Sequence, residues 1–190
     1  MKTGLYFGSF NPVHIGHLII ASYVANNTDV EQVWFVVSPQ NPFKNSATLL
    51  NEYHRLHLVR LATEDDNQLK VIDVEFKLPR PSYTIDTIAY LKEKYPQNQF
   101  SIIMGSDGLQ NIEKWKNYGE LVKHNPLIIY KRTGFEVSPV PGADITVLEA
   151  PLLEISATTI RRLIKEGRSI RYLVPDKVRE QIEAAGYFKR

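Results

Sequence analysis

Two histidines three residues apart, His14 and His17, lie in the segment GSFNPVHIGH, which runs from Gly8 to His17. An apolar stretch precedes the segment at residues 4–7, and an apolar, helix-like run follows it at residues 18–25. An anion site forms where a strand leads through a glycine-containing turn into the start of a helix. Unpaired N–H groups and the positive end of the helix then face the anion. The spacing places both imidazoles on one face of the first helical turn. The segment therefore indicates chemistry on a phosphate group.

The same segment also has plainer interpretations. Two nearby histidines occur as surface or capping groups, and a metal pair needs a further ligand that the neighbouring residues do not supply. The segment has neither the glycine spacing of a dinucleotide fingerprint nor the Gly-Lys-Ser/Thr of a P-loop. By itself it favours phosphate binding and an ordinary helix start about equally.

Length and composition narrow the class of protein. The chain has 190 residues, of which 43% are hydrophobic, and this suits one domain with a real core. Its 23 basic and 21 acidic residues give a net charge of +2, too balanced to indicate a nucleic-acid partner. The absence of cysteine excludes disulfides, cysteine-bound zinc and a thiol nucleophile. Without a signal peptide or an apolar run near ~18 residues, we expect a cytoplasmic protein with no membrane partner.

Strand-like and helix-like runs alternate along the chain. The strand-like runs fall at residues 32–37, 69–74, 100–104, 127–130 and 145–148, and the helix-like runs at 49–62, 84–95, 156–167 and 176–185. This alternation, with apolar strands, predicts an α/β fold: a doubly wound parallel sheet with helices on both faces and a C-terminal helical segment. No repeat or long linker divides the chain, so we expect a single domain spanning residues 1–190.

Polar, unusual segments follow three of the predicted strands, at residues 8–17, 38–45 and 105–107. Parallel sheets bind ligands at the carboxyl ends of their strands, near the point where the strand order reverses. We therefore expect the three segments to share one cleft.

Further residues could contribute to that cleft, although each has a plainer explanation. Lys44 lies in a proline-containing loop, NPFK, that could be ordinary surface. Tyr83 and Thr84 belong to SYTIDT, whose hydroxyls a simple helix N-cap explains equally well. Trp115 follows Asp107 by eight residues, and a lone tryptophan is more often part of a core.

The segment ISATTIR, from Ile155 to Arg161, starts a helix with hydroxyls at its positive end. Arg161 follows one turn into that helix and could pair with a phosphate. A capped amphipathic helix is the plainer interpretation of the same residues.

Taken together, these segments resemble a known family. GSFNPVHIGH resembles the first motif of the nucleotidylyltransferase superfamily and ISATTIR resembles its second. SYTIDT, MGSD at residues 104–107 and Trp115 resemble the bacterial nicotinate mononucleotide adenylyltransferases in particular. The motifs match in order from Gly4 to about Phe188, which is nearly the whole chain.

The resemblance implies a Rossmann-like core over residues 1–150 and C-terminal helices over 151–190 that carry the second motif. It also implies the reaction of ATP with nicotinate mononucleotide to give deamido-NAD and pyrophosphate, a late step of NAD biosynthesis. Mg²⁺ would be carried by the ATP phosphates, and we assign no protein ligand to it. The sequence leaves open whether the protein forms a homo-oligomer.

The same resemblance suggests roles for individual residues. The catalytic groups would be His14, His17 and Arg161. ATP would be bound by Gly8, Ser9, Phe10, His17, Gly105, Asp107, Ile155, Ser156, Thr158 and Arg161. The mononucleotide would be bound by Lys44, Tyr83, Thr84, Asp107, Trp115 and Arg132.

Three positions depart from the usual motifs: Asn11 replaces an aspartate of many relatives, Ser9 a threonine or glycine, and Ala157 a serine. Three other functions remain open. The chain could use phosphopantetheine, it could prefer nicotinamide mononucleotide, or it could be a nucleotide-binding sensor without catalysis. The last of these would not need His14, His17 and Arg161 together.

Overall fold

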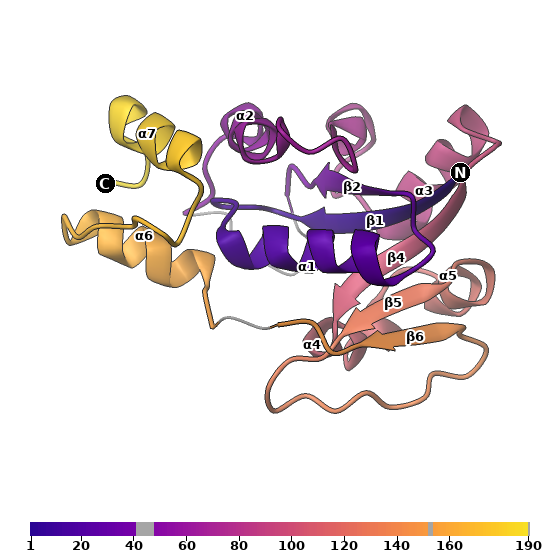
Figure 1. The fold of residues 1–190 in the computed structure, drawn as a ribbon. Helices are drawn as coiled ribbons and strands as arrows, with labels where there is room; N and C mark the ends of the chain where they lie inside the picture. Colours follow the sequence, from indigo (N-terminus) through magenta and orange to yellow (C-terminus); the bar gives the residue numbers. More distant parts are fainter. Residues whose placement is uncertain (41–47, 152–153, 190) are drawn as a thin grey trace.

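The computed structural model describes residues 1–40, 48–151 and 154–189. Within these residues, six strands form one parallel sheet in the order β3-β2-β1-β4-β5-β6 (Figure 1). The strands are β1 (Lys2–Gly8), β2 (Gln32–Val37), β3 (Leu69–Ile72), β4 (Gln99–Gly105), β5 (Leu127–Tyr130) and β6 (Ile145–Leu148). The strand order reverses between β1 and β4, as expected for a Rossmann-like fold. The predicted fold class is therefore confirmed.

Helices cover both faces of the sheet, because successive strand side chains point to opposite sides. Tyr6 and Phe35 belong to the core that includes residues of α1 (Ile15–Asn27) and α2 (Glu52–Thr63). Leu5 and Trp34 belong to the core on the other face. That second core includes residues of α3 (Thr84–Lys94), α4 (Ser106–Leu109) and α5 (Tyr118–His124). Two buried faces explain why the inner strands β2 and β5 are apolar throughout, whereas the edge strands β3 and β6 have exposed positions.

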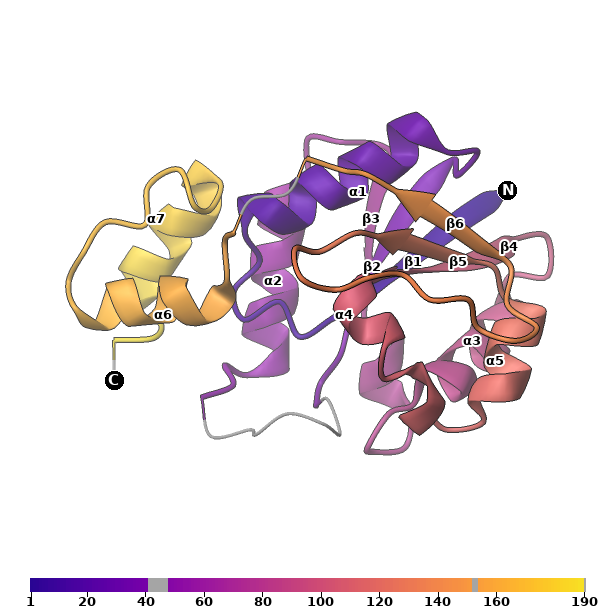
Figure 2. The same cartoon turned by 90° about the horizontal axis from the view of Figure 1, so that it is seen from below.

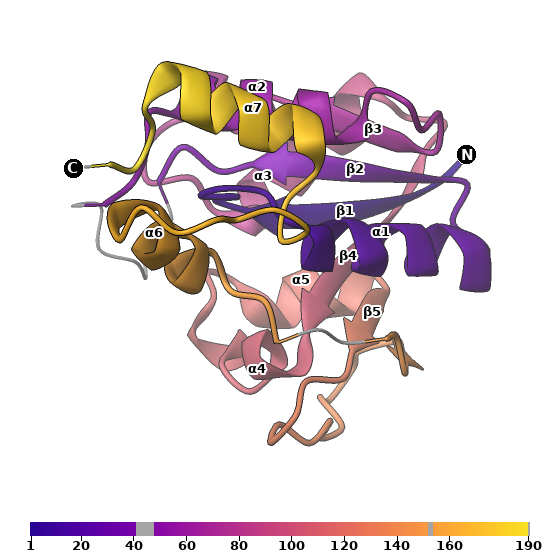
Figure 3. The same cartoon turned by 60° about the vertical axis from the view of Figure 1, so that its left-hand side comes forward.

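The C-terminal helices α6 (Ala157–Lys165) and α7 (Asp176–Ala185) lie together beyond α2, on the side away from β5 and β6 (Figure 2). Helix α7 packs against α2, as Figure 3 shows, and buries Val178 and Ile182. The Tyr187 hydroxyl lies 2.9 Å from Nδ1 of His54 across this contact. The second motif is thereby fixed to the body of the domain. No helix in the described ranges is long and apolar enough to span a membrane.

Most predicted elements lie where expected, and the differences have local causes. Helix α2 begins at Glu52 instead of residue 49, because the Asn51 side chain accepts the Tyr53 N–H at 3.0 Å and caps the helix. Strand β3 ends at Ile72, and residues Val74–Lys77 form a short 3₁₀ helix. The short helices α4 and α5 were not predicted, since neither is long enough to show a helical period.

Candidate active site

A cavity of about 600 Å³ opens at the carboxyl edge of the sheet. Every predicted site residue that the structure describes lines it: Gly8, Ser9, Phe10, His14, His17, Tyr83, Thr84, Gly105, Asp107, Trp115, Arg132, Ile155, Ser156, Thr158 and Arg161. Lys44 lies outside the described residues. The volume is in the usual range for sites that hold small ligands. The sheet register explains the gathering, because Gly8 and Val37 are paired across β1 and β2, and Gly105 and Tyr130 across β4 and β5.

Gly8 ends β1, and the chain then turns sharply into the cavity wall. Phe10 adopts a left-handed backbone conformation with φ of 46°, and its ring is buried. A Cβ atom on Gly8 would lie 2.8 Å from Cζ of this ring, which is too close for any side chain. Glycine is therefore required where the backbone passes beneath Phe10.

Asn11 holds the turn through both ends of its amide. Its Nδ2 donates to the Thr48 carbonyl at 2.9 Å, and its Oδ1 accepts the Leu50 N–H at 3.1 Å. An ionised aspartate could accept from Leu50 but could not donate to Thr48. Asparagine at position 11 can therefore make both contacts, to Thr48 and to Leu50, and its side chain stabilises the turn.

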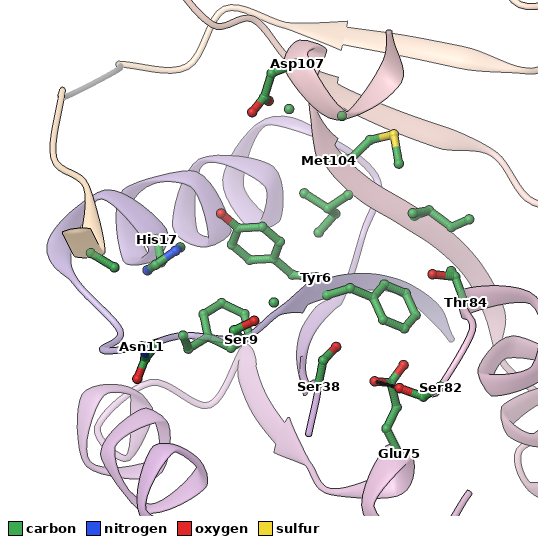
Figure 4. A pocket seen from close by; sticks show the side chains of 18 of the residues that line it. Tyr6, Ser9, Asn11, His17, Ser38, Glu75, Ser82, Thr84, Met104 and Asp107 are labelled. Carbon is green, nitrogen blue, oxygen red and sulfur yellow. Dashed lines mark hydrogen bonds between the residues drawn. The ribbon is translucent and has the colours of Figure 1, made fainter. Parts of the chain in front are cut away.

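The two motif histidines are in contact. Their rings stack with centroids 3.6 Å apart and an interplanar angle of 25°. The backbone N–H of His14 donates to Nδ1 of His17 at 3.2 Å. Because Nδ1 accepts this hydrogen bond, Nε2 carries the proton in the neutral His17 ring. The Nε2–H donor of His17 therefore lies on the side of the ring opposite the hydrogen bond from His14. Figure 4 shows His17 beside the cavity.

His14 is far more buried than a solvent-facing histidine. Its side chain is 6% exposed, and its Nδ1 makes no hydrogen bond to any described residue. Gly16 permits this arrangement, since a Cβ there would lie 3.1 Å from that Nδ1. Burial, reinforced by repulsion from Arg132, lowers the pKa of His14 to about 4. The ring is therefore neutral at physiological pH unless a bound anion supports its protonation.

This shift predicts acid sensitivity of the unliganded protein. The unfolded chain binds a proton on His14 below its ordinary pKa of 6.5, whereas the folded chain does so only near 4. The free energy of unfolding should therefore fall as pH falls from 6.5 to 4, by up to about 3 kcal/mol from this group. Urea unfolding across that range measures the slope.

The control separates His14 from other titrating groups. Burial raises the pKa of Glu75, so this group makes the folded state more stable as pH falls through values just above the ordinary carboxyl range. Its contribution therefore has the opposite sign to that of His14. We therefore compare His14→Gln, which should flatten the slope, with His57→Gln, a change at an exposed histidine of α2. Equal slopes in all three proteins would contradict the assignment.

The start of α6 forms a second helix end at the cavity. The Ser156 hydroxyl accepts the Thr159 N–H at 3.1 Å, so the expected helix cap is present. Arg161 donates from one guanidinium nitrogen to the Asn11 carbonyl at 2.7 Å and from the other to the Thr158 hydroxyl at 3.2 Å. These bonds connect the two motifs, which lie 150 residues apart in the chain.

Asp107 and Arg132 form an ion pair at the end of β4. Arg132 Nε lies 3.3 Å from Asp107 Oδ1, with both side chains about half exposed. Gly105 makes room for the pair, because a Cβ there would lie 2.3 Å from that Asp107 oxygen. The second Asp107 oxygen and the outer guanidinium nitrogens can therefore meet hydroxyls and phosphates of a ligand.

The start of α3 is not capped by a side chain, so the simple-cap interpretation of SYTIDT is wrong. Tyr83 is the N-cap residue, and among the described residues neither Thr84 nor Ile85 donates its backbone N–H. Lys116 lies above the Tyr83 ring, 4.8 Å from its centroid, and pairs with Asp86 at 2.8 Å. This end of the helix can receive an anionic group through two N–H donors and the positive helix end.

Two buried charged residues beside the cavity were missed by sequence reasoning. Arg55 is fully buried and donates to the carbonyls of Ser9, Ser38, Pro39 and Leu50 at 2.5–2.9 Å. Burial lowers the pKa of Arg55 to about 10, which leaves it charged at neutral pH. Its position beside Leu58 and Val59 on the apolar face of α2 could have marked it.

Glu75 is the second missed residue. It is 2% exposed, lines the cavity and accepts hydrogen bonds from the Ser82 and Thr87 hydroxyls. No spacing in the sequence indicates these contacts.

Across residues 1–40, 48–151 and 154–189, no three or more His, Cys, Asp or Glu side chains gather in a way that could hold a metal ion.

Comparison with known proteins agrees with this geometry. A family model described as cytidylyltransferase-like matches residues 5–163. The chain is 48% identical to the "probable nicotinate-nucleotide adenylyltransferase" of Flavobacterium psychrophilum, with all of both chains covered. It is 47% identical to the protein of the same name from Cytophaga hutchinsonii, covering 99% of this chain and 98% of that one.

A solved structure is similar in fold. It is that of Plasmodium falciparum nicotinic acid mononucleotide adenylyltransferase complexed with NaAD, with a TM-score of 0.80. The similarity covers 98% of this chain and 97% of that chain, at 19% sequence identity. At this level of identity the match supports the arrangement of strands and helices.

Proposed function

The chain belongs to the cytidylyltransferase-like family and, within it, to the nicotinate-nucleotide adenylyltransferases, and on that premise we propose that it transfers the adenylyl group of ATP to nicotinate mononucleotide. The products are deamido-NAD and pyrophosphate. One observation carries the proposal: a single cavity is lined by the starts of α1 and α6 and also by the uncapped start of α3. Figure 4 shows His17 and Thr84 on opposite sides of this cavity.

The transfer is direct and in line. A phosphate oxygen of the mononucleotide forms a bond to the α-phosphorus of ATP. The bond from that phosphorus to the bridging oxygen of the β-phosphate breaks, and pyrophosphate leaves with the electron pair. Since the substrate supplies the nucleophile, the protein needs only to position the reactants and stabilise charge.

The groups at α1 and α6 would act on ATP. His17 donates its Nε2–H to an α-phosphate oxygen, and the backbone N–H groups of Ser9 and Phe10 hold the bridging phosphates. Arg161, with Ser156 and Thr158, binds the β- and γ-phosphates and so stabilises the leaving group. His14, which is neutral and buried, would support the same phosphates by a hydrogen bond. ATP enters as its Mg²⁺ complex.

Groups at the start of α3 and in the segments that follow β4 and β5 would bind the mononucleotide. Trp115 stacks on the pyridine ring, and the N–H groups at the start of α3, at Thr84, receive the nicotinate carboxylate. Asp107 accepts hydrogen bonds from ribose hydroxyls, and Arg132 neutralises phosphate charge. Lys44 would assist with phosphate charge as well.

Removal of the indole should affect one substrate. Trp115→Ala is expected to raise KM for nicotinate mononucleotide about tenfold, as lost stacking and apolar contact predict, with KM for ATP changed less than about twofold. Initial rates with each substrate varied in turn measure both values. A larger rise in KM for ATP would show that Trp115 serves the other substrate.

The proposal is tested by measuring pyrophosphate release with ATP and Mg²⁺ and three acceptors in parallel: nicotinate mononucleotide, nicotinamide mononucleotide and phosphopantetheine. Charge-assisted hydrogen bonds at α3 predict a preference for the acid over the amide of roughly tenfold to a hundredfold. A preference for the amide would overturn the carboxylate site, and turnover with phosphopantetheine alone would overturn the function. Absence of turnover with every acceptor would favour a nucleotide-binding sensor. We also propose that the protein acts in the cytoplasm.

A further inference from the structure

Glu75 is a buried carboxyl group that the adenylyl transfer described above does not use. It lies in the 3₁₀ helix Val74–Lys77, just after β3, and its side chain is 2% exposed. Figure 4 shows it below Ser82 and close to Ser38, at the Thr84 side of the cavity. Three elements therefore converge on one carboxyl group: the 3₁₀ helix, the end of β2 and the start of α3.

Its contacts are hydroxyl groups instead of cations. Ser82 Oγ donates to one carboxyl oxygen at 2.8 Å, and Thr87 Oγ1 donates to the other at 2.9 Å. These two hydroxyls lie on either side of the first turn of α3, before Thr84 and after it. The carboxyl group thus holds both ends of the turn whose Thr84 and Ile85 N–H groups have no hydrogen-bond acceptor among the described residues.

The arrangement keeps those donors available. A carboxylate near a helix start ordinarily accepts the helix N–H groups itself. Glu75 is instead occupied by side-chain hydroxyls, and Tyr83 at the N-cap contributes no side-chain acceptor. Stability alone does not require this polar cluster, because apolar side chains at positions 75, 82 and 87 together would bury no polar group there.

We propose that Glu75 is a positioning residue for acceptor selection: by bridging Ser82 and Thr87 it fixes the first turn of α3, so that its N–H groups face the carboxylate of the mononucleotide. The role depends on hydrogen-bond geometry and not on charge. The inference rests on the proposed function for the identity of the ligand, whereas the bridge itself is a property of the protein alone.

Two substitutions at Glu75 separate the loss of its negative charge from the loss of its hydrogen bonds. Glu75→Gln keeps an acceptor for one hydroxyl and can donate to the other, whereas Glu75→Leu keeps only volume. In Glu75→Leu we expect KM for nicotinate mononucleotide to rise about tenfold, KM for ATP to change less than about twofold and the acid-to-amide preference to fall. In Glu75→Gln, both KM values and the acid-to-amide preference should stay within about threefold of wild type.

A second pair of variants covers the case in which Glu75→Leu does not fold. Thr87→Val removes one hydroxyl of the bridge and should raise KM for the mononucleotide about threefold to fivefold. Thr63→Val is its matched control, because Thr63 is also buried in a helix and also donates to the carbonyl four residues earlier. Thr63→Val should leave both KM values unchanged.

Hydrogen–deuterium exchange without ligand gives a readout independent of activity. The N–H groups of Asp86 and Thr87, which donate to the Tyr83 carbonyl, should exchange faster in Glu75→Leu and Thr87→Val than in wild type or Glu75→Gln. Unchanged exchange there, equal effects on both KM values, or a Glu75→Gln defect as large as that of the leucine or valine variant would each overturn the positioning role. Absence of wild-type turnover with the acid would contradict the proposed function instead, and the exchange comparison would still decide whether the bridge exists.

Discussion

Replacing His17 with alanine is expected to lower kcat about 10²- to 10³-fold, the range for removing one donor from a charge-stabilising site. The hydrogen bond from the His14 N–H to Nδ1 leaves His17 with its proton on Nε2, which would meet the charge that develops at the α-phosphorus. Because this charge grows in the transition state, Kd for ATP should change less than about threefold. Single-turnover kinetics and nucleotide titration measure the two quantities.

His57→Ala is the control for this change. His57 is an exposed histidine of α2 that does not line the cavity, so its removal should leave kcat unaltered. An unchanged kcat in His17→Ala would remove His17 from the catalytic groups. A rise in Kd for ATP equal to the loss in kcat/KM would instead assign it to ground-state binding.

Arg161→Ala is expected to lower kcat/KM for ATP about 10²-fold, because two charge-assisted contacts to the leaving group would be lost. The same change removes the hydrogen bond to the Asn11 carbonyl, so the turn of the first motif loses its link to α6. Arg161→Lys keeps the charge but cannot make both contacts, and it should fall between the wild type and alanine variants.

Arg162→Ala is a matched comparison one residue away. Arg162 is exposed on the same helix and does not line the cavity, so kcat/KM should remain within about twofold of wild type. Equal losses at Arg161 and Arg162 would show only a general effect of positive charge. Steady-state rates at low and high salt would then separate long-range attraction from contact.

The fold could be predicted because its signals are local. Apolar runs at residues 32–37 and 127–130 coincide with strands that are buried on both faces, and the run at 145–148 coincides with the edge strand β6, which is partly exposed. The carboxyl-edge rule then brings Gly8 and Gly105 to one cavity without knowledge of the side chains. Helices α4 and α5 escaped prediction because a single turn or two carries no recognisable period.

The positions of the site residues could be predicted where they belong to motifs, but their partners could not. The amide of Asn11 is explained only by Thr48 and Leu50, which lie almost forty residues away. Glu75 meets its partners only once the end of β3 is packed against the start of α3. Arg55 carries charge on an apolar helix face, and only the folded loops reveal the carbonyls that justify its burial.

The stereochemistry at the α-phosphorus tests the central claim most directly. ATP made chiral at that phosphorus with sulfur and an oxygen isotope is converted with nicotinate mononucleotide, and the configuration of the dinucleotide product is determined. One direct in-line displacement within this cavity predicts inversion. Retention of configuration would reveal a second displacement through an adenylyl-protein intermediate and would contradict the account.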